Sequence, residues 1–320
     1  MSLVVPNGSS FTEFLILGFS HSEKQKVPLF LLFLLIYLFT VISNTLIIAL
    51  ISLDSNLHKP MYFFLCNMSC LDIFFTSVTA PTLLHITGKN NISFMMCMVQ
   101  LYFFSSFTVI EYLLLTTMAY DRYVAICRPL FYPQVMNQRT CILLAAAAWI
   151  GGFLSGAPVT ILISALTFCA SNIINHFFCD ILPLLKLSCD DTSTVEFVMF
   201  AQGSLFLFSC FILTMMSYIY IISAILKITS VEGRHKTFST CGSHLTSVTL
   251  FYVLLICVYL KPPSLYSLDK GKVVSVLYVN VIPMLNPIIY SLRNKDVKKA
   301  LNELTRFFWH HVATTIHHSG

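Results

Sequence analysis

The chain has 320 residues, of which 57% are hydrophobic and only 10% are charged, and its mean hydropathy is +0.80. Soluble globular domains carry roughly 25% charged residues. The composition therefore excludes an ordinary soluble domain and places the chain in a lipid bilayer. The formal net charge is +5, and we expect membrane lipid but no nucleic acid among the partners.

Seven apolar stretches are long enough to cross about 30 Å of hydrocarbon, which takes roughly 20 helical residues each. They cover residues 27–53, 60–86, 94–120, 140–163, 195–226, 238–260 and 272–292. Several contain a proline, which a bundle tolerates because neighbouring helices can satisfy the carbonyl that the proline frees. The sequence therefore predicts an all-α membrane protein, a bundle of seven transmembrane helices.

A short amphipathic helix is expected after the last span. Its apolar and basic residues can occupy opposite helix faces: Leu292, Val297, Ala300, Leu301 and Leu304 on one, and Arg293, Lys295, Lys298 and Lys299 on the other. Such a helix lies on the inner leaflet, where basic side chains meet anionic lipid; a frayed polar tail is the alternative. We divide the chain into an extracellular tail (1–26), a seven-transmembrane domain (27–292) and a cytoplasmic tail (293–320).

The orientation follows from the basic residues, because Lys and Arg are retained in the cytoplasmic connections. With the N-terminus outside, twelve of the 19 lie inside: Lys59, Arg122, Arg128, Arg139, Lys227, Arg234, Lys236, Arg293, Lys295, Lys298, Lys299 and Arg306. The outer tail also carries the glycosylation sequon Asn7-Gly8-Ser9. We predict a multi-pass plasma-membrane protein with an extracellular N-terminus, a cytoplasmic C-terminus and a glycan on Asn7.

Four of the eleven cysteines fall on the outer side in this orientation: Cys97, Cys169, Cys179 and Cys189. Because that compartment is oxidising, four outer thiols predict two disulfides. Three connectivities are possible, and the cysteine positions alone do not choose among them.

Five ordered motifs run along the chain: LHKPMYFFL (57–65), MAYDRYVAIC (118–127), Ser217-Tyr218, KTFSTCGSH (236–244) and PMLNPIIY (283–290). With these motifs the chain resembles the olfactory receptor family of the rhodopsin-like G-protein-coupled receptors over nearly its full length. Two positions depart from the family pattern, since Ser43 stands for the usual Gly and Thr237 for the usual Ala. Ser43 could alter the close packing of the first helix.

The resemblance implies the disulfide pairs Cys97–Cys179 and Cys169–Cys189. It also excludes two ligand classes within the superfamily. Phe104 occupies the position where amine receptors carry an aspartate, and Asn280 the position where opsins carry the retinal-binding lysine. A biogenic amine and retinal are therefore not the expected ligands.

A conformational switch is implied at the inner end of the third span, where Asp121 would hold Arg122 in the resting state. On activation the sixth span would swing outward and free Arg122 for a G-protein α subunit. The expected switch residues are Asp121, Arg122, Tyr123, Tyr218, Asn286, Pro287 and Tyr290. An interfacial Arg–Asp pair that only anchors a helix is the alternative, but it does not account for the whole set.

Two carboxylates, Asp72 and Glu111, lie deep within spans, where an isolated charge costs about 2.5–3.5 kcal/mol. They should therefore lie near each other or near a cation. The resemblance places them at an internal sodium site together with Asn44 and Asn286, as a structural ion rather than a cofactor. The alternative is one proton shared by the two carboxylates with no ion.

The ligand pocket is expected between the outer halves of spans three, five, six and seven. The candidates are Phe104, Ser105, Thr108, Val109, Tyr112, Gln202, Phe206, Tyr252, Leu255, Ile256, Tyr259, Val276 and Val279. This set is mostly apolar, with a few hydroxyls and one amide, which suits a small neutral or weakly polar molecule. Each of these residues could instead serve only to pack the bundle.

We therefore expect an odorant receptor that binds a small, mostly apolar volatile molecule and activates an olfactory-type stimulatory heterotrimeric G protein, raising cAMP. A non-olfactory small-molecule sensor on the same scaffold is the alternative. A transporter or channel is disfavoured because no inverted repeat with matching broken segments is visible. An enzyme is not expected, because no nucleophile–base pair, metal triad or phosphate loop is recognisable.

Overall fold

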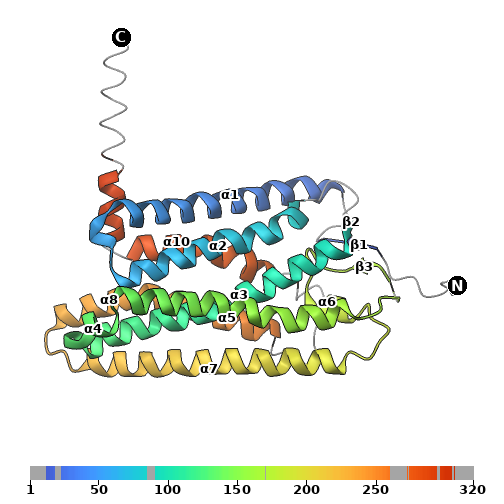
Figure 1. Cartoon of the computed structure of the whole chain (residues 1–320). Helices are drawn as coiled ribbons and strands as arrows, with labels where there is room; N and C mark the ends of the chain where they lie inside the picture. The colour runs from blue at the N-terminus through green and yellow to red at the C-terminus, as the bar shows by residue number, and fades with distance from the viewer. Residues whose placement is uncertain are drawn as a thin grey trace, which may run out of the picture.

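The computed structural model describes residues 12–18, 23–84, 91–169, 171–259, 272, 274–293, 296–304 and 306. Asn7, the expected glycosylation site, lies outside these residues. Seven long helical segments, counted over the described residues, form an elongated bundle (Figure 1).

Six of these segments are continuous α-helices: α1 (Glu23–Leu53), α2 (Pro60–Leu84), α3 (Phe94–Cys127), α5 (Gln138–Ser164), α7 (Ser193–Leu226) and α8 (Val231–Tyr259). The seventh contains the π-helical segment η4 (Leu277–Val281) followed by α10 (Ile282–Arg293). Shorter elements join them: η1 (Ser55–Leu57), η2 (Pro129–Phe131), α4 (Tyr132–Val135) and α6 (Ile181–Leu185).

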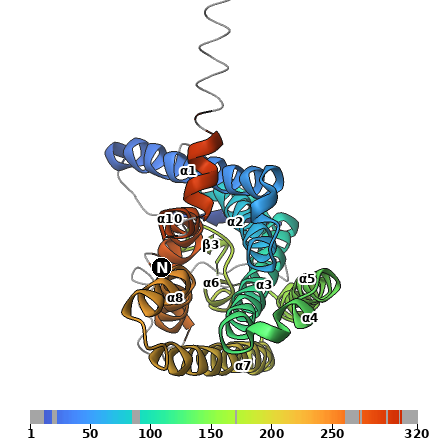
Figure 2. The same ribbon diagram turned by 90° about the vertical axis from the view of Figure 1, so that its left-hand side faces the viewer.

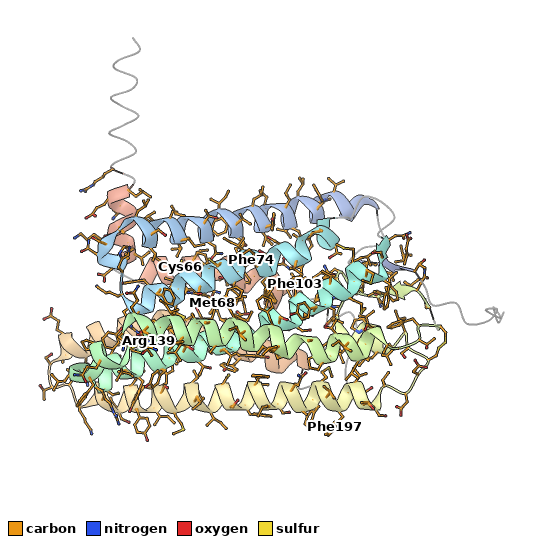
Figure 3. The ribbon with its side chains drawn as sticks, viewed as in Figure 1. Cys66, Met68, Phe74, Phe103, Arg139 and Phe197 are labelled. Carbon is orange, nitrogen blue, oxygen red and sulfur yellow. A yellow bond between two sulfur atoms is a disulfide. The ribbon has the colours of Figure 1, made fainter. Side chains whose placement is uncertain are left out.

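Five of these helices are long and apolar enough to cross a membrane, namely α1, α2, α3, α5 and α7. The other two segments contain shorter apolar helices, His244–Val253 and Val274–Ile289. The third helix is longer than predicted and continues from residue 120 to Cys127. Large apolar side chains on the outside of the bundle, such as Leu154 (69% exposed) and Phe197 (70% exposed), would face lipid (Figure 3).

Local capping explains where two of the long helices begin. The hydroxyl of Ser93 accepts a hydrogen bond from the backbone N–H of Met96 at the start of α3. The amide oxygen of Asn137 likewise accepts from the N–H of Thr140 at the start of α5. Each cap satisfies one of the N–H groups that a helix N-terminus leaves without a partner.

Helix α3 is the centre of the packing, since it lies between α2, α5 and α7 when the bundle is viewed end-on (Figure 2). Two glycines let α5 approach it closely. A Cβ atom at Gly152 would lie 2.8 Å from the backbone oxygen of Ser106, and one at Gly156 would lie 2.2 Å from the Ser106 hydroxyl. Side chains larger than hydrogen at these positions would force the two helices apart.

A small sheet lies at one end of the bundle, which the all-α prediction did not include. Its strands are β1 (Glu13–Ile16), β2 (Asn91–Ser93) and β3 (Ile173–Ile174), in the order β2-β1-β3. Strand β1 pairs antiparallel with β2 and parallel with β3. Strands this short come from three distant parts of the chain, so no local hydrophobic pattern marks them.

Both disulfides lie at the same end as the sheet, and they join Cys97 to Cys179 and Cys169 to Cys189. These are the two expected pairs. We call this end of the bundle the disulfide end, and the opposite end, where Asp121 and Arg122 lie near the end of α3, the Arg122 end.

A further helical stretch, residues 296–304, runs across the direction of the long helices at the Arg122 end (Figure 1). Val297 and Ala300 are buried against the bundle, whereas Lys298 and Lys299 are exposed. Asp296 accepts hydrogen bonds from Lys59 at 3.4 Å and from the Tyr62 hydroxyl at 3.1 Å. These contacts fix the stretch to the start of α2.

Candidate functional site

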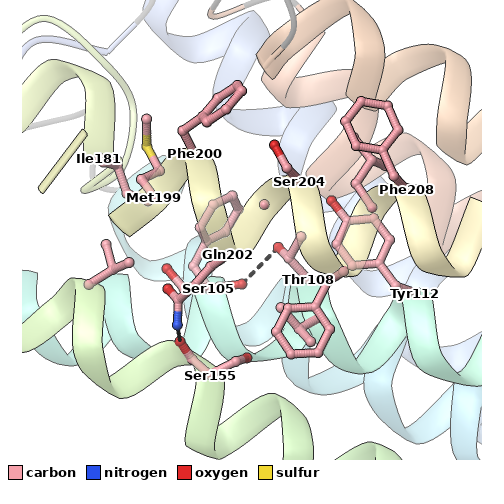
Figure 4. Close-up of a pocket in the computed structure, with 16 residues that line it drawn as sticks. Ser105, Thr108, Tyr112, Ser155, Ile181, Met199, Phe200, Gln202, Ser204 and Phe208 are labelled. Atoms are coloured by element: carbon pink, nitrogen blue, oxygen red, sulfur yellow. Dashed lines mark hydrogen bonds between the residues drawn. The ribbon is translucent and has the colours of Figure 1, made fainter. Parts of the chain in front are cut away.

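A cavity of about 180 Å³ lies between α3, α5 and α7 in the half of the bundle nearer the disulfide end (Figure 4). Its described lining is Phe104, Ser105, Thr108, Val109, Tyr112, Ser155, Val159, Ile181, Met199, Phe200, Gln202, Gly203, Ser204, Phe206, Leu207 and Phe208. None of these side chains is formally charged. The wall is apolar with a few hydroxyls and one amide, and Gln202 donates its side-chain N–H to the Ser155 carbonyl at 3.3 Å.

Seven of the thirteen expected pocket residues lie on this wall: Phe104, Ser105, Thr108, Val109, Tyr112, Gln202 and Phe206. Tyr252 is not on the described wall, but its ring stacks on Tyr112 at a centroid distance of 6.4 Å. Val276 and Val279 pack in the apolar core instead. The side chains of Leu255, Ile256 and Tyr259 lie outside the part of the chain that the structure describes.

The second connection at the disulfide end, between α5 and α7, closes the bundle above the cavity. Ile181 from this connection is on the cavity wall, and Phe178 packs on the wall residue Phe104 at 4.7 Å between ring centroids. The backbone N–H of Cys179 donates to the side-chain oxygen of Gln100 in α3 at 2.9 Å. A disulfide and a buried hydrogen bond thus hold this segment on α3.

Two titratable groups are buried in the same connection. Burial, together with the nearby ammonium of Lys272, lowers the pKa of His176 to about 3. Burial raises the pKa of Asp180 to about 6, although its carboxylate accepts a hydrogen bond from the Ile181 N–H. His176 is therefore neutral near pH 7, whereas Asp180 is mostly ionised despite its burial.

Lys272 ties three segments together at this end. Its ammonium donates to the Gly18 carbonyl at 3.1 Å and to the side-chain oxygen of Asn175 at 2.6 Å. Lys272 precedes η4 in the chain, Gly18 follows β1, and Asn175 follows β3. The N-terminal segment and the connection above the cavity are thereby linked to the seventh segment.

A cluster of buried polar groups lies deeper in the bundle. Asn286 donates to both carboxylate oxygens of Asp72, at 3.1 and 3.3 Å. The hydroxyl of Tyr278 lies 3.4 Å from a Glu111 carboxylate oxygen and 3.2 Å from the hydroxyl of Thr108. Because Thr108 is also on the cavity wall, these contacts connect the cavity to the buried carboxylates.

The expected sodium residues gather around this cluster. Asp72 and Glu111 are close enough to interact electrostatically, and neither forms an ion pair with a Lys or Arg among the described residues. Asn44 donates to the Pro283 carbonyl at 3.1 Å, while its buried side-chain oxygen has no hydrogen-bond partner among the described residues. Carboxylate and amide oxygens are suitable donors for a hard cation, so the residues fit a sodium ion.

At the Arg122 end, Asp121 holds two neighbouring side chains. Arg122 donates to one oxygen of the buried Asp121 carboxylate, with its Nε at 2.9 Å, and the Tyr132 hydroxyl donates to the other at 2.8 Å. Burial and the Asp121 charge raise the pKa of Tyr132. Both Asp121 oxygens therefore have partners, and Arg122 is paired within its own helix.

A second polar pair joins α7 and α8 near Arg122. The hydroxyl of Tyr218 lies 2.5 Å from a ring nitrogen of His244, and both side chains are buried. Tyr123 packs beside them in a small apolar cluster with Ala119, Ile221 and Cys241. Pro287 is buried in α10, and the side chain of Tyr290 lies outside the described part of the chain.

Comparison with known proteins identifies this arrangement. The sequence model of the olfactory receptor family matches residues 33–306. The chain belongs to the olfactory receptor family. Its family members are receptors for small molecules that act through a G protein at the plasma membrane, and they are not enzymes. This olfactory receptor is therefore an odorant receptor, as its motifs indicated.

Similar receptors cover nearly the whole chain. Olfactory receptor 5M5 of Mus musculus is 48% identical over 306 residues, which covers 95% of this chain and 96% of that receptor. Olfactory receptor 8U1 of Homo sapiens is 48% identical over 300 residues, covering 93% and 97%. Squid rhodopsin has a similar structure, with a TM-score of 0.66 over 88% of this chain and 81% of its own, at 16% identity. That likeness shows a shared fold.

The sequence analysis did not select three residues that contact the functional residues of this olfactory receptor. Tyr132, Tyr278 and His244 each form a buried or half-buried polar contact with an expected residue. His244 lies in the KTFSTCGSH motif and could have been selected as a polar residue entering an apolar span. No local pattern marks Tyr132 or Tyr278, because their partners are set by how the helices cross.

Proposed function

We propose that the receptor binds a small, neutral, mostly apolar volatile molecule in the cavity between α3, α5 and α7, and that binding activates an olfactory-type stimulatory G protein, raising cAMP. The observation that carries the proposal is the cavity wall, which is apolar and has no formal charge among its described side chains. Hydroxyls and an amide on an apolar wall orient a weakly polar ligand. A carboxylate or ammonium ligand would meet no opposite charge among the described side chains of the wall.

Signal transfer follows the polar contacts that lead away from the cavity. A ligand that displaces Thr108 changes the surroundings of the Tyr278 hydroxyl, and Tyr278 also contacts Glu111. We propose that Asp121, Arg122, Tyr123, Tyr218, Asn286, Pro287 and Tyr290 form the switch. The Asp121–Arg122 pair belongs to the resting form of the receptor. A ligand favours the active form only by the difference between its affinities for the active and the resting form.

The test is cAMP accumulation in cells that carry the olfactory stimulatory α subunit, over a panel of neutral volatile compounds. Arg122→Ala should abolish every response while surface receptor remains. Arg139→Ala is the matched control, because Arg139 is an exposed arginine at the start of α5 and its variant should respond normally. Equal responses from wild type and Arg122→Ala would refute the proposed coupling.

We also propose that Asp72, Glu111, Asn44 and Asn286 hold a sodium ion that favours the resting form. Two observations support it: neither carboxylate pairs with a Lys or Arg among the described residues, and the Asn44 side-chain oxygen has no hydrogen-bond partner there. Basal cAMP should fall as sodium replaces choline in the medium, and Glu111→Gln should lose that dependence. The same sodium response in both receptors would favour a shared proton instead.

The topology belongs to the same proposal. The N-terminus lies outside with a glycan on Asn7, and the C-terminus lies in the cytoplasm. Residues 296–304 form an amphipathic helix on the inner leaflet, where exposed Lys298 and Lys299 meet anionic lipid. A mobility shift on glycosidase treatment, lost in Asn7→Gln, tests the outer tail. Antibody access to a C-terminal epitope only after permeabilisation tests the inner one.

A further inference from the structure

A second cavity, of about 440 Å³, lies between α2 and α3 at the disulfide end. The side chains of Ile16 in β1 and Ile92 in β2 contribute to it from the sheet. Its described lining is Ile16, Ser77, Val78, Pro81, Thr82, Asn91, Ile92, Ser93, Met96, Val99, Gln100 and Phe103. It shares no described lining residue with the odorant cavity.

The cavity crosses the expected boundary between hydrocarbon and headgroups. An α-helix rises about 1.5 Å per residue, so about 30 Å of hydrocarbon measured outward from Arg122 ends near residue 102 of α3. Phe103 then lies in hydrocarbon, while Asn91 and Ser93 lie beyond it. Met96 (60% exposed) and Val99 (43% exposed) leave the cavity open toward lipid.

Further aromatic rings continue the apolar surface below the cavity. Phe74 of α2 is 52% exposed and stacks on Phe107 at 6.4 Å, and Phe103 packs on Phe107 at 5.6 Å. Figure 3 labels Phe74 on α2 and Phe103 on α3. A molecule can therefore reach this cavity from the bilayer.

The polar groups select a neutral occupant with a polar end. Among the described residues, the Glu13 carboxylate contacts the lining, where it accepts a hydrogen bond from Asn91 at 3.0 Å. It would repel a fatty acid or a phosphate. The hydroxyls of Ser93 and Thr82 and the amide of Asn91 can still bond to a hydroxyl group.

The shape favours a compact body. The α3 part of the lining, from Met96 to Phe103, is about 10 Å long, so the mean cross-section is about 40 Å² for the cavity volume of 440 Å³. Hydrocarbon groups in contact lie about 4–4.5 Å apart, so one extended chain fills about 20 Å². A rigid ring system fills the space better and loses less conformational entropy on binding.

We propose that this cavity is a binding site for a membrane sterol. The sterol hydroxyl lies near Asn91 and Ser93, and the sterol rings lie along Val78, Val99 and Phe103. The site is separate from odorant binding, and the binding test below does not depend on G-protein coupling.

Gln100 gives the site a route to the odorant cavity. Its amide N–H groups donate to the Val78 carbonyl at 2.8 Å and to the Thr82 hydroxyl at 3.1 Å, and its oxygen accepts from the Cys179 N–H at 2.9 Å. Ile181, two residues after Cys179, is on the odorant cavity wall. A sterol that packs on Gln100 therefore stabilises the closed arrangement of the connection above the odorant.

The experiment uses purified full-length receptor in phosphatidylcholine nanodiscs that contain a cholesterol analogue with a diazirine on its ring system. After irradiation, labelled peptides are located by mass spectrometry, with and without excess unlabelled cholesterol. Val99→Trp fills the cavity with a large side chain at a lipid-exposed position, and Met96→Trp is a second filling variant. Leu154→Trp is the control, because Leu154 is 69% exposed on α5, away from the cavity.

The expected result is competed labelling on peptides that contain residues 77–82 or 96–103. Both filling variants should reduce it by about tenfold or more, a change of about 1.4 kcal/mol in binding, and Leu154→Trp should leave it unchanged. Labelling spread evenly over α5 and α7 would overturn the proposal, as would equal labelling in all variants. Displacement by a fatty acid or phospholipid as effective as by cholesterol would also overturn it.

Discussion

The two ends of the bundle are held together by different kinds of interaction. At the disulfide end, two disulfides, a three-stranded sheet and the buried ammonium of Lys272 join the N-terminal segment, two connections and the seventh segment. At the Arg122 end, the long-range polar contacts among the described residues include the pair Tyr218–His244, beside a small apolar cluster, and the bonds of Asp296 with Lys59 and Tyr62. Disulfides fix the first end, whereas the described contacts that join segments at the second end are non-covalent.

This difference matches the division of work in a receptor. A hydrogen bond contributes about 0.5–1.5 kcal/mol net to stability, so ligand binding can exchange one partner for another at the Arg122 end. The same energy cannot break a disulfide. The disulfide end should therefore keep the odorant cavity in shape, and the Arg122 end should change its arrangement.

The largest expected effect comes from the disulfides. Removal of a native disulfide typically costs about 2–5 kcal/mol. Cys97→Ser should lower surface expression and melting temperature more than Cys169→Ser, because Cys97–Cys179 links residues 82 apart and ties the connection to α3. Cys169–Cys189 links residues only 20 apart, and both of its cysteines lie in the connection between α5 and α7.

Flow cytometry of surface receptor and thermal unfolding of purified receptor measure this effect. The double variant Cys97→Ser/Cys179→Ser serves as the control, since it leaves neither cysteine of this disulfide as an unpaired thiol. If Cys169→Ser were the more harmful change, the disulfide end would depend on the connection itself rather than on its attachment to α3.

The Arg122 end is tested by two variants of one contact. His244→Phe removes the hydrogen bond between Tyr218 and His244 but keeps the tyrosine hydroxyl, which Arg122 can meet in the active form. Loss of about 1 kcal/mol from the resting form should raise basal cAMP by about fivefold. Tyr218→Phe removes the hydroxyl from both forms, so it should reduce the odorant response without raising basal cAMP.

Basal cAMP per surface receptor is the measurement, with the inert Arg139→Ala as a reference. Equal increases in His244→Phe and Tyr218→Phe would mean that Tyr218 has no role in the active form. No increase in either variant would mean that this hydrogen bond does not restrain α8.

The two ends also differ in how much of their structure could be predicted from the sequence. The spans follow from long apolar runs, and the predicted start of the third at residue 94 coincides with that of α3. The Asp121–Arg122 contact was expected because the two residues are adjacent. The sheet was not, because β1, β2 and β3 are short and pair over long distances.

The cavity shows the same limit. Its α3 wall was predicted, because Phe104, Thr108 and Tyr112 recur at helical spacing. Its α5 wall, including Ser155, was not, since α5 reaches the cavity only through its close approach to α3 at Gly152 and Gly156. Periodicity gives the face of a helix, but the distance between two helices depends on both.

A smaller effect is expected at the hydrogen bonds of Gln100. Gln100→Leu would leave the Cys179 N–H buried without a partner, which costs about 1–3 kcal/mol. Part of this cost should weaken odorant binding, so the half-maximal odorant concentration should rise several-fold. Gln100→Glu keeps an acceptor for Cys179 and should lie closer to wild type. Equal half-maximal odorant concentrations for the wild type, Gln100→Leu and Gln100→Glu would mean that Gln100 does not position the connection between α5 and α7.

The smallest effect expected in the wild type is the pH dependence of stability, because two buried groups contribute to it in opposite directions. The pKa of His176 falls from 6.5 to about 3 on folding. The folded state therefore loses stability as pH falls below 6.5, because the unfolded chain then binds a proton that the buried imidazole does not. The pKa of Asp180 rises from 3.8 to about 6, so the folded state loses stability as pH rises from about 4 to 6. Each changes stability by at most about 1.4 kcal/mol per pH unit.

Between pH 6 and 4 the contributions of His176 and Asp180 to stability should nearly cancel in the wild type. A variant that removes one of these groups should show the pH dependence caused by the group that remains. Asp180→Asn leaves His176 beside Lys272, so its melting temperature should fall as pH falls from 6.5. His176→Phe leaves Asp180, so its melting temperature should rise as pH falls from 6 to 4. Thermal unfolding of purified receptor across this range measures both slopes. Parallel curves for the two variants would mean that burial shifts the pKa of neither group, and that the disulfide end is more open to water than its packing indicates.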